Sequence, residues 1–193
     1  MIVDSRSKIE NPRCGSKNIG VQNAMSRARI QMTLEVFESS CKPLVAVLEN
    51  ISVEQLNWKA GPESRSIGEI CRHLVRVDAW FLRRLGISPV VSDAKSGTRE
   101  ELAENMQRVQ QQVKEVVTAC ASDEELHLER TSLDGKDKEK LGVAVIHMAQ
   151  HYLYHLAQII YLRRAQDREW PSPHNDWDAA THVIGDYLLG IKN

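Results

Sequence analysis

Apolar residues recur at steps of three and four along four long segments of the chain, and this spacing constrains the fold more than any other feature of the sequence. The segments span residues 30–48, 67–85, 102–120 and about 139–166. Steps of three and four place side chains on one face of an α-helix, whereas a half-buried strand alternates with a period of two. No useful stretch of period-two alternation is present. The pattern therefore predicts an all-α protein, a four-helix bundle whose neighbouring helices are antiparallel or mixed in direction.

Capping residues predict where the second and third helices begin and end. Ser66 is followed three residues later by Glu69, the spacing of a capping box, and Gly86 follows the last apolar residue of the same stripe. Either Ser96 or Thr98 is expected to cap the third helix, which has acidic residues in its first turn. These residues place two helices on either side of a loop near residues 86–98.

Three further features predict departures from a plain bundle. Pro43 interrupts the first helix, so we expect a kink there or a helix that starts afresh. Residues 52–58 predict a short helical turn. Asp176 is expected to cap a short additional C-terminal helix that runs to Leu189 and stops at Gly190.

Residues 1–24 are polar and unpatterned, so we expect a flexible N-terminal tail followed by one helical-bundle domain over residues 25–193. Translation could start at Met1 or at Met25, and the sequence does not decide between them.

Charge and composition exclude several functional classes. The chain has 25 Lys and Arg residues against 26 Asp and Glu, a formal net charge of −1, which argues against a nucleic-acid partner. No apolar run is long enough to span a membrane, and the first residues lack the apolar core of a signal peptide. The four cysteines (Cys14, Cys41, Cys71 and Cys120) show no paired spacing. We therefore expect reduced thiols and a cytoplasmic protein.

Three of the seven histidines recur at steps of four on the fourth helix, at His147, His151 and His155. Residues four apart share a helical face, so two of these imidazoles can converge on one metal ion. All three cannot easily do so, because His147 and His155 are separated by about 12 Å along the helix axis. The spacing alone leaves open which adjacent pair binds.

A third ligand must come from another helix, and His73 is the candidate because it lies beside the core stripe of the second helix. Three histidines leave one coordination position open, which is typical of a catalytic zinc ion rather than a structural one. Glu69 is explained as a cap, and Asp78 is a carboxylate that could orient an imidazole.

Two blocks of the sequence resemble the DinB/YfiT-like superfamily of metal-binding helical bundles. Trp58 ahead of the segment Ser66-Ile-Gly-Glu-Ile…His73-Leu resembles the first block of that family. His151-Tyr-Leu-Tyr-His155-Leu-Ala-Gln158-Ile resembles the second, in which Arg-Gly-Gln-Ile follows the second histidine. The resemblance covers roughly residues 25–166.

The resemblance implies a homodimeric bundle in which His73, His151 and His155 bind a divalent metal ion, zinc or nickel in most cases. It implies that His147 lies one turn away from the ligands. It further implies a metal-dependent enzyme, which is either a transferase with a low-molecular-weight thiol as co-substrate or a hydrolase. Leu156 and Ala157 replace the usual Arg and Gly, so no substrate contact is inferred at these two positions.

Two functions remain open at this point. The first is a metal-dependent enzyme acting on a small-molecule substrate, with His147, Gln158, Trp80 and Tyr154 as candidate pocket residues. The alternative is a non-catalytic metal-binding or stress-response bundle that acts as a dimer. A purely structural metal site should be closed by a fourth protein ligand, and the sequence shows no obvious one.

Overall fold

The computed structural model of the chain describes residues 27–93 and 97–190, so the expected tail, Met25, Cys14 and Ser96 lie outside the described residues. Four long helices dominate the fold: α2 (Ala28–Ala46), α4 (Ile67–Arg84), α5 (Arg99–Thr118) and α6 (Leu141–Gln166). The smaller elements are α3 (Val53–Asn57), the 3₁₀ turn η1 (Asp123–Leu126), strands β1 (Glu129–Thr131) and β2 (Lys138–Lys140), and α7 (His174–Leu189).

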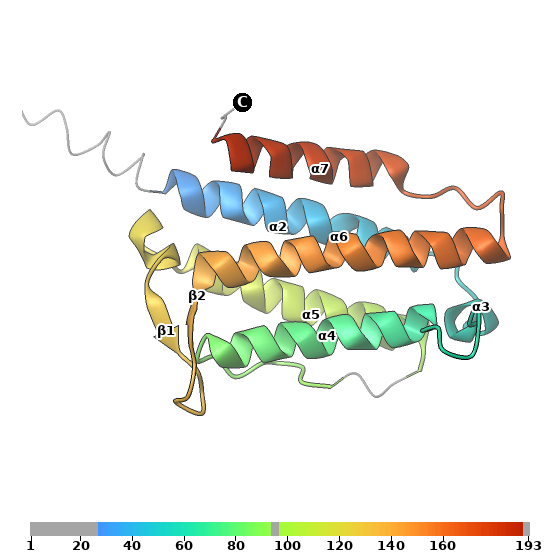
Figure 1. Cartoon of the computed structure of the whole chain (residues 1–193), viewed down its shortest axis with the longest axis horizontal. Coiled ribbons are helices and arrows are strands. Elements are labelled where there is room, and N and C mark those ends of the chain that lie inside the picture. The colour runs from blue at the N-terminus through green and yellow to red at the C-terminus, as the bar shows by residue number, and fades with distance from the viewer. Residues whose placement is uncertain (1–26, 94–96, 191–193) are drawn as a thin grey trace, which may run out of the picture.

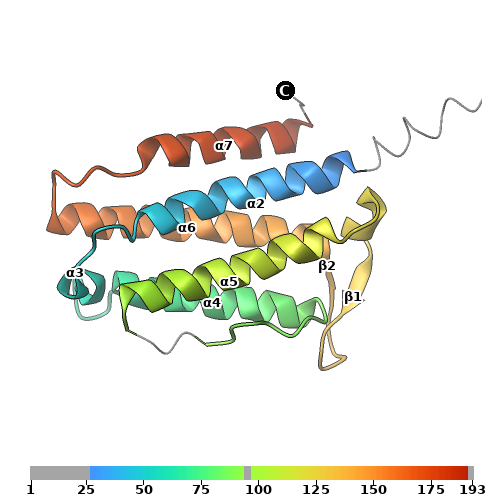
Figure 2. The same cartoon turned by 180° about the vertical axis from the view of Figure 1, so that it is seen from behind.

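The four long helices form the predicted bundle, with mixed helix directions (Figure 1). α2 and α6 lie side by side and run in the same direction, while α4 and α5 lie side by side and run the opposite way. Figure 2 shows the same arrangement from behind, with α7 packed along the outer side of α2. The candidate metal ligands His73, His151 and His155 lie on α4 and α6, which are antiparallel neighbours.

Each long helix contributes large apolar side chains to one continuous core. Phe37 of α2, Leu74 of α4, Met106 of α5 and Tyr152 of α6 are all essentially inaccessible to solvent. The rings of Phe37 and Tyr152 meet with centroids 5.6 Å apart. Burial of these stripes supplies the main driving force for the bundle.

The helix starts follow the predicted caps with one exception. The Ser66 hydroxyl accepts a hydrogen bond from the backbone N–H of Glu69 at 3.2 Å, and the Glu69 carboxylate accepts one from the N–H of Ser66 at 2.8 Å. Thr98 caps α5. The prediction that Asp176 caps α7 is wrong, because α7 begins at His174 and Asp176 lies in its first turn, where it pairs with Lys42 at 2.6 Å.

α2 continues through Pro43 to Ala46 instead of starting afresh, and the proline is buried in its last turns. Both ends of α2 are held by distant side chains. Asp123 accepts hydrogen bonds from the N–H groups of Arg29 and Ile30 at 3.1 and 2.9 Å. The Arg163 guanidinium donates to the carbonyl of Val47 at 2.7 Å and stacks on Trp170. These contacts satisfy the free backbone groups that every helix end leaves.

The small β-ribbon was not predicted, because each strand has only three residues and is too short to show alternation. The ribbon joins η1 to α6 and docks against the end of α4 at Gly86. That glycine has φ +76°, and a Cβ built on it would lie 2.6 Å from the carbonyl oxygen of Thr131. Gly86 therefore ends α4, as predicted, and also allows the close approach of β1.

One buried hydrogen bond fixes α4 against α6. The Tyr152 hydroxyl donates to Oδ2 of Asp78 at 2.5 Å, and both residues are buried. Oδ1 of Asp78 has no hydrogen-bond partner in the described part of the chain. Burial raises the pKa of Asp78 to about 8, so the carboxyl group stays largely protonated at neutral pH.

Across residues 27–93 and 97–190, no helix combines the length and apolar character needed to cross a membrane. Cys41, Cys71 and Cys120 are free thiols, as expected, with Cys71 and Cys120 buried and Cys41 partly exposed.

Two glycines with the same backbone conformation give a matched test of the ribbon contact. Gly135 has φ +75° in open space, so Gly135→Ala should lower the free energy of unfolding by about 1 kcal/mol through backbone strain alone. Gly86→Ala adds the clash with Thr131, so we expect a loss of about 2 kcal/mol or more. Urea denaturation of the two variants measures the difference, and equal losses would show that the ribbon moves aside freely.

The buried Asp78 predicts an unusual dependence of stability on pH. A carboxyl group whose pKa is about 8 in the folded protein binds its proton more tightly than in the unfolded chain. Its contribution to stability is therefore complete in acid and is lost as the pH rises toward 8, at up to about 1.4 kcal/mol per pH unit. Asp78→Asn keeps an acceptor for Tyr152 but cannot ionise. The difference in unfolding free energy between variant and wild type, measured from pH 5 to 9, should grow in favour of the variant, and a constant difference would contradict the assignment.

Candidate metal centre

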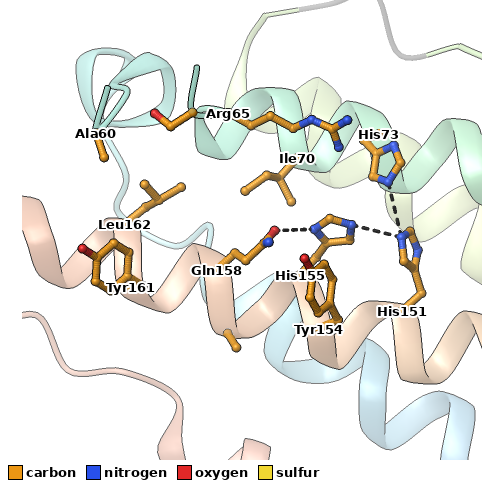
Figure 3. A pocket seen from close by; sticks show the side chains of 12 residues that line it. Ala60, Arg65, Ile70, His73, His151, Tyr154, His155, Gln158, Tyr161 and Leu162 are labelled. Atoms are coloured by element: carbon orange, nitrogen blue, oxygen red, sulfur yellow. Dashed lines mark hydrogen bonds between the residues drawn. The ribbon is translucent and has the colours of Figure 1, made fainter. Parts of the chain in front are cut away.

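Three histidines converge between α4 and α6, one from α4 and two from successive turns of α6 (Figure 3). Nε2 of His151 lies 3.3 Å from Nε2 of His73 and 3.0 Å from Nε2 of His155. One ligand atom from each of the three residues fits within a group no wider than 4.8 Å. The ring planes are inclined to one another by 72°, 75° and 83°, so the rings meet edge to face and no two of them stack.

These distances fit a divalent ion. Ligands arranged tetrahedrally around zinc at about 2.0–2.1 Å lie about 3.3 Å from one another. Lone pairs of neutral imidazoles at this separation repel one another unless a proton or a cation lies between them. The three histidines therefore form a group that could hold a metal ion.

The electrostatic environment keeps all three imidazoles available as ligands. Burial is the main cause that lowers the pKa of both His73 and His151 to about 4, and nearby positive charges act in the same direction. Burial also lowers the pKa of His155, against an opposing effect of its hydrogen bond with Gln158. Neutral imidazole is the form that binds metals, so the protein environment holds the donors in that form at neutral pH.

Gln158 orients one of the three rings. Its Oε1 accepts a hydrogen bond of 2.7 Å from Nδ1 of His155, one turn earlier on α6. With the proton on Nδ1, the lone pair of Nε2 faces His73 and His151. Nδ1 of His151 is buried and has no hydrogen-bond partner within the described residues. A hydrogen bond therefore orients the ring of His155 but not the ring of His151.

A pocket of about 880 Å³ opens directly beside the histidines. The loop before α4, the first turns of α4 and the exposed face of α6 form its walls. The lining residues are Ala60, Ser64, Arg65, Ile70, His73, His151, Tyr154, His155, Ala157, Gln158, Tyr161 and Leu162. No Cys, Asp or Glu from the described ranges joins the three-histidine group, so the site lacks a fourth protein ligand there and faces the pocket.

The structure places the four candidate pocket residues differently. Gln158 and Tyr154 line the pocket. His147 is exposed one turn away and contacts the edge of Phe81, with ring centroids 5.0 Å apart. Trp80 is 49% exposed and lies under the guanidinium of Arg84, so neither His147 nor Trp80 lines this pocket.

Three other sequence expectations can be placed as well. Asp78 does not orient an imidazole in this structure, because within the described residues its carboxyl group is hydrogen-bonded to Tyr152 and its other oxygen has no partner. Leu156 points into the core and is fully buried, whereas Ala157 lies in the pocket wall.

Sequence reasoning missed several pocket residues. Tyr161 and Leu162 follow His155 and Gln158 at helical spacing, so the face defined by the histidines could have identified them. Arg65 belongs to no periodic pattern, since it lies in the loop before the capped start of α4. Only the folded structure brings it to the pocket.

Comparisons with known proteins agree with this architecture. The structure resembles the crystal structure of a DinB-like protein from Bacillus cereus ATCC 10987, with a TM-score of 0.60 and 15% sequence identity. The match covers 69% of this chain and 90% of the solved chain, and at this identity it supports the fold alone. No curated protein matches the chain.

The sequence itself matches the family model of the DinB superfamily over residues 37–159. That range is more than half of the chain and contains both α4 and the part of α6 that carries the histidines. The chain therefore belongs to the DinB superfamily.

Proposed function

We propose that this protein is a metal-dependent enzyme that uses His73, His151 and His155 to hold one divalent ion, zinc or nickel. The observation that carries this proposal is the convergence of three Nε2 atoms at the wall of an open pocket, with no fourth protein ligand in the described residues. A catalytic zinc site has this composition, whereas structural sites are closed by four protein ligands.

The bound ion would lower the pKa of a thiol or water molecule in its open position and so supply a nucleophile at neutral pH. The chain's own residues have separate tasks. His73, His151 and His155 present neutral donors, and Gln158 fixes the ring of His155. Apolar walls formed by residues such as Ile70 and Leu162 reduce the water around the reacting atoms.

The lining of the pocket favours thiol transfer over hydrolysis. None of its lining residues is an Asp or Glu, so no carboxylate in the described pocket wall is placed to take a proton from an attacking water molecule. A low-molecular-weight thiol needs no such base once it is ionised, and histidine ligands tolerate a soft thiolate beside them. We therefore propose a transferase that uses a thiol co-substrate. Hydrolysis is the second candidate activity of the same site.

The alternative is a non-catalytic metal-binding dimer. Such a protein does not require an open coordination position beside a large pocket. The homodimer and the cytoplasmic location implied above stay predictions, and light scattering of the purified protein tests the first of them.

Metal content of single-histidine variants tests both the site and its register on α6. We expect about one zinc or nickel ion per wild-type chain by elemental analysis, and loss of that ion in His73→Ala and in His155→Ala. His147→Ala is the matched control, because His147 lies on the same helix two turns before His155 and outside the cluster. Circular dichroism should show that all three variants keep their helices.

Two results would contradict this assignment. If the wild-type protein takes up no metal even after reconstitution, the proposal of a metal-dependent enzyme is wrong. Loss of metal in His147→Ala with retention in His155→Ala would instead move the site one turn along α6.

Gln158 gives a second prediction, on affinity. Gln158→Leu removes the acceptor for Nδ1 of His155 and leaves the three donors in place, so metal affinity should fall about 10- to 100-fold. Gln158→Glu restores an acceptor and should recover most of that loss. Competition with a chromogenic chelator measures both. Equal affinities for all three proteins would show that the hydrogen bond does not support the site.

A further inference from the structure

Among the described residues that line the pocket, only Arg65 has a permanent formal charge. Figure 3 shows its guanidinium reaching over Ile70 toward His73 and His155, across the pocket from Gln158. No hydrogen bond or ion pair joins Arg65 to a side chain of the described residues.

The backbone around Arg65 is fixed on both sides. Before it, the Ser64 hydroxyl donates to the carbonyl of Gly61 at 2.8 Å and accepts from the N–H of Gly61 at 2.9 Å. After it, Ser66 and Glu69 form the capping box of α4. The long arginine side chain is therefore attached at a defined point of the pocket rim.

Fold stability does not account for a cation at this position. Arg65 immediately precedes the N-terminal cap of α4, where the helix dipole disfavours positive charge. Glu69, four residues further along the chain, is paired with Lys59 at 2.8 Å. An arginine on the rim of a pocket, with no carboxylate partner among residues 27–93 and 97–190, can gain its partner from a ligand.

The two ends of the pocket differ in character. The histidines and Arg65 lie at one end, and Ala60, Tyr161 and Leu162 lie at the other, on the left of Figure 3. Since no acidic side chain lines the described walls, a metal ion with three neutral ligands would leave this site strongly positive. The complementary ligand is an anion with an apolar body.

We propose that Arg65 recognises the carboxylate of a small organic acid, which is the substrate class of this site. The acid binds with its carboxylate at the histidine end and its apolar portion along Ile70 toward Leu162 and Tyr161. This inference rests on the proposed function, because it places the reacting part of the acid beside the metal-binding histidines.

NMR titration with 4-phenylbutyrate and with its uncharged amide tests the proposal on both metal-free and zinc-loaded protein. We expect the acid to bind wild type about tenfold more tightly than the amide, because the amide lacks the negative charge and the second acceptor oxygen of the carboxylate. Arg65→Gln should abolish that preference in the metal-free protein, where no metal ion can hold the carboxylate, and should leave zinc content unchanged. Arg76→Gln is the matched control: Arg76 is exposed on α4 and acts on His73 electrostatically but does not line the pocket.

The outcomes separate this inference from the function on which it rests. One zinc ion per chain together with an unchanged preference in Arg65→Gln would overturn the inference and leave the metal site intact. An equal loss of the preference for the acid in Arg65→Gln and Arg76→Gln would overturn it too, since the preference would then come from the overall positive charge of this surface and not from contact with Arg65. Tighter binding of inorganic phosphate than of the acid would also overturn it, because the ligands of Arg65 would then be phosphates and not carboxylates. A preference that disappears only in Arg65→Gln supports the inference, even if the protein takes up no metal.

Discussion

The candidate site depends on the register between α4 and α6, and a hydrogen bond in the core holds that register. Tyr152 and Asp78 join the two helices at 2.5 Å in a position closed to solvent. His73 precedes Asp78 on α4, and His151 immediately precedes Tyr152 on α6. Because His73 lies on α4 whereas His151 and His155 both lie on α6, a shift of one helix past the other would move Nε2 of His73 away from the other two. A buried, nearly isolated polar pair of this kind favours one register over others, at some cost in stability.

The register of α4 against α6 brings together the groups that determine the chemistry of the pocket. The three imidazoles stay neutral because they are partly or fully buried, and Gln158 orients the ring of His155. Beyond them the described walls are mostly apolar, and Arg65 on the rim brings the one permanent formal charge among the lining residues. The arrangement combines donors for a divalent ion, an open position and a positive rim, and these three properties together favour a small anionic substrate over a structural role.

Much of the fold and the histidine cluster could be predicted from the sequence because both depend on local periodicity. The apolar steps identify the helices, Ser66 and Glu69 mark the start of α4, and His151 and His155 must share a helical face. The remaining features depend on contacts between distant residues. The ribbon is too short for alternation, Pro43 is tolerated near the end of α2, and the parallel course of α4 and α5 is set by a connection with no strong pattern. Arg65 and the Asp78–Tyr152 hydrogen bond become visible only once α4 and α6 are packed.

A crystal structure of the zinc-loaded protein, with an anomalous difference map recorded at the zinc absorption edge, tests the central claim most directly. We expect a single strong peak at about 2.0–2.2 Å from Nε2 of each of His73, His151 and His155, with the remaining coordination position facing the pocket. A zinc ion bound by other residues, or one closed off by a fourth protein ligand, would contradict it.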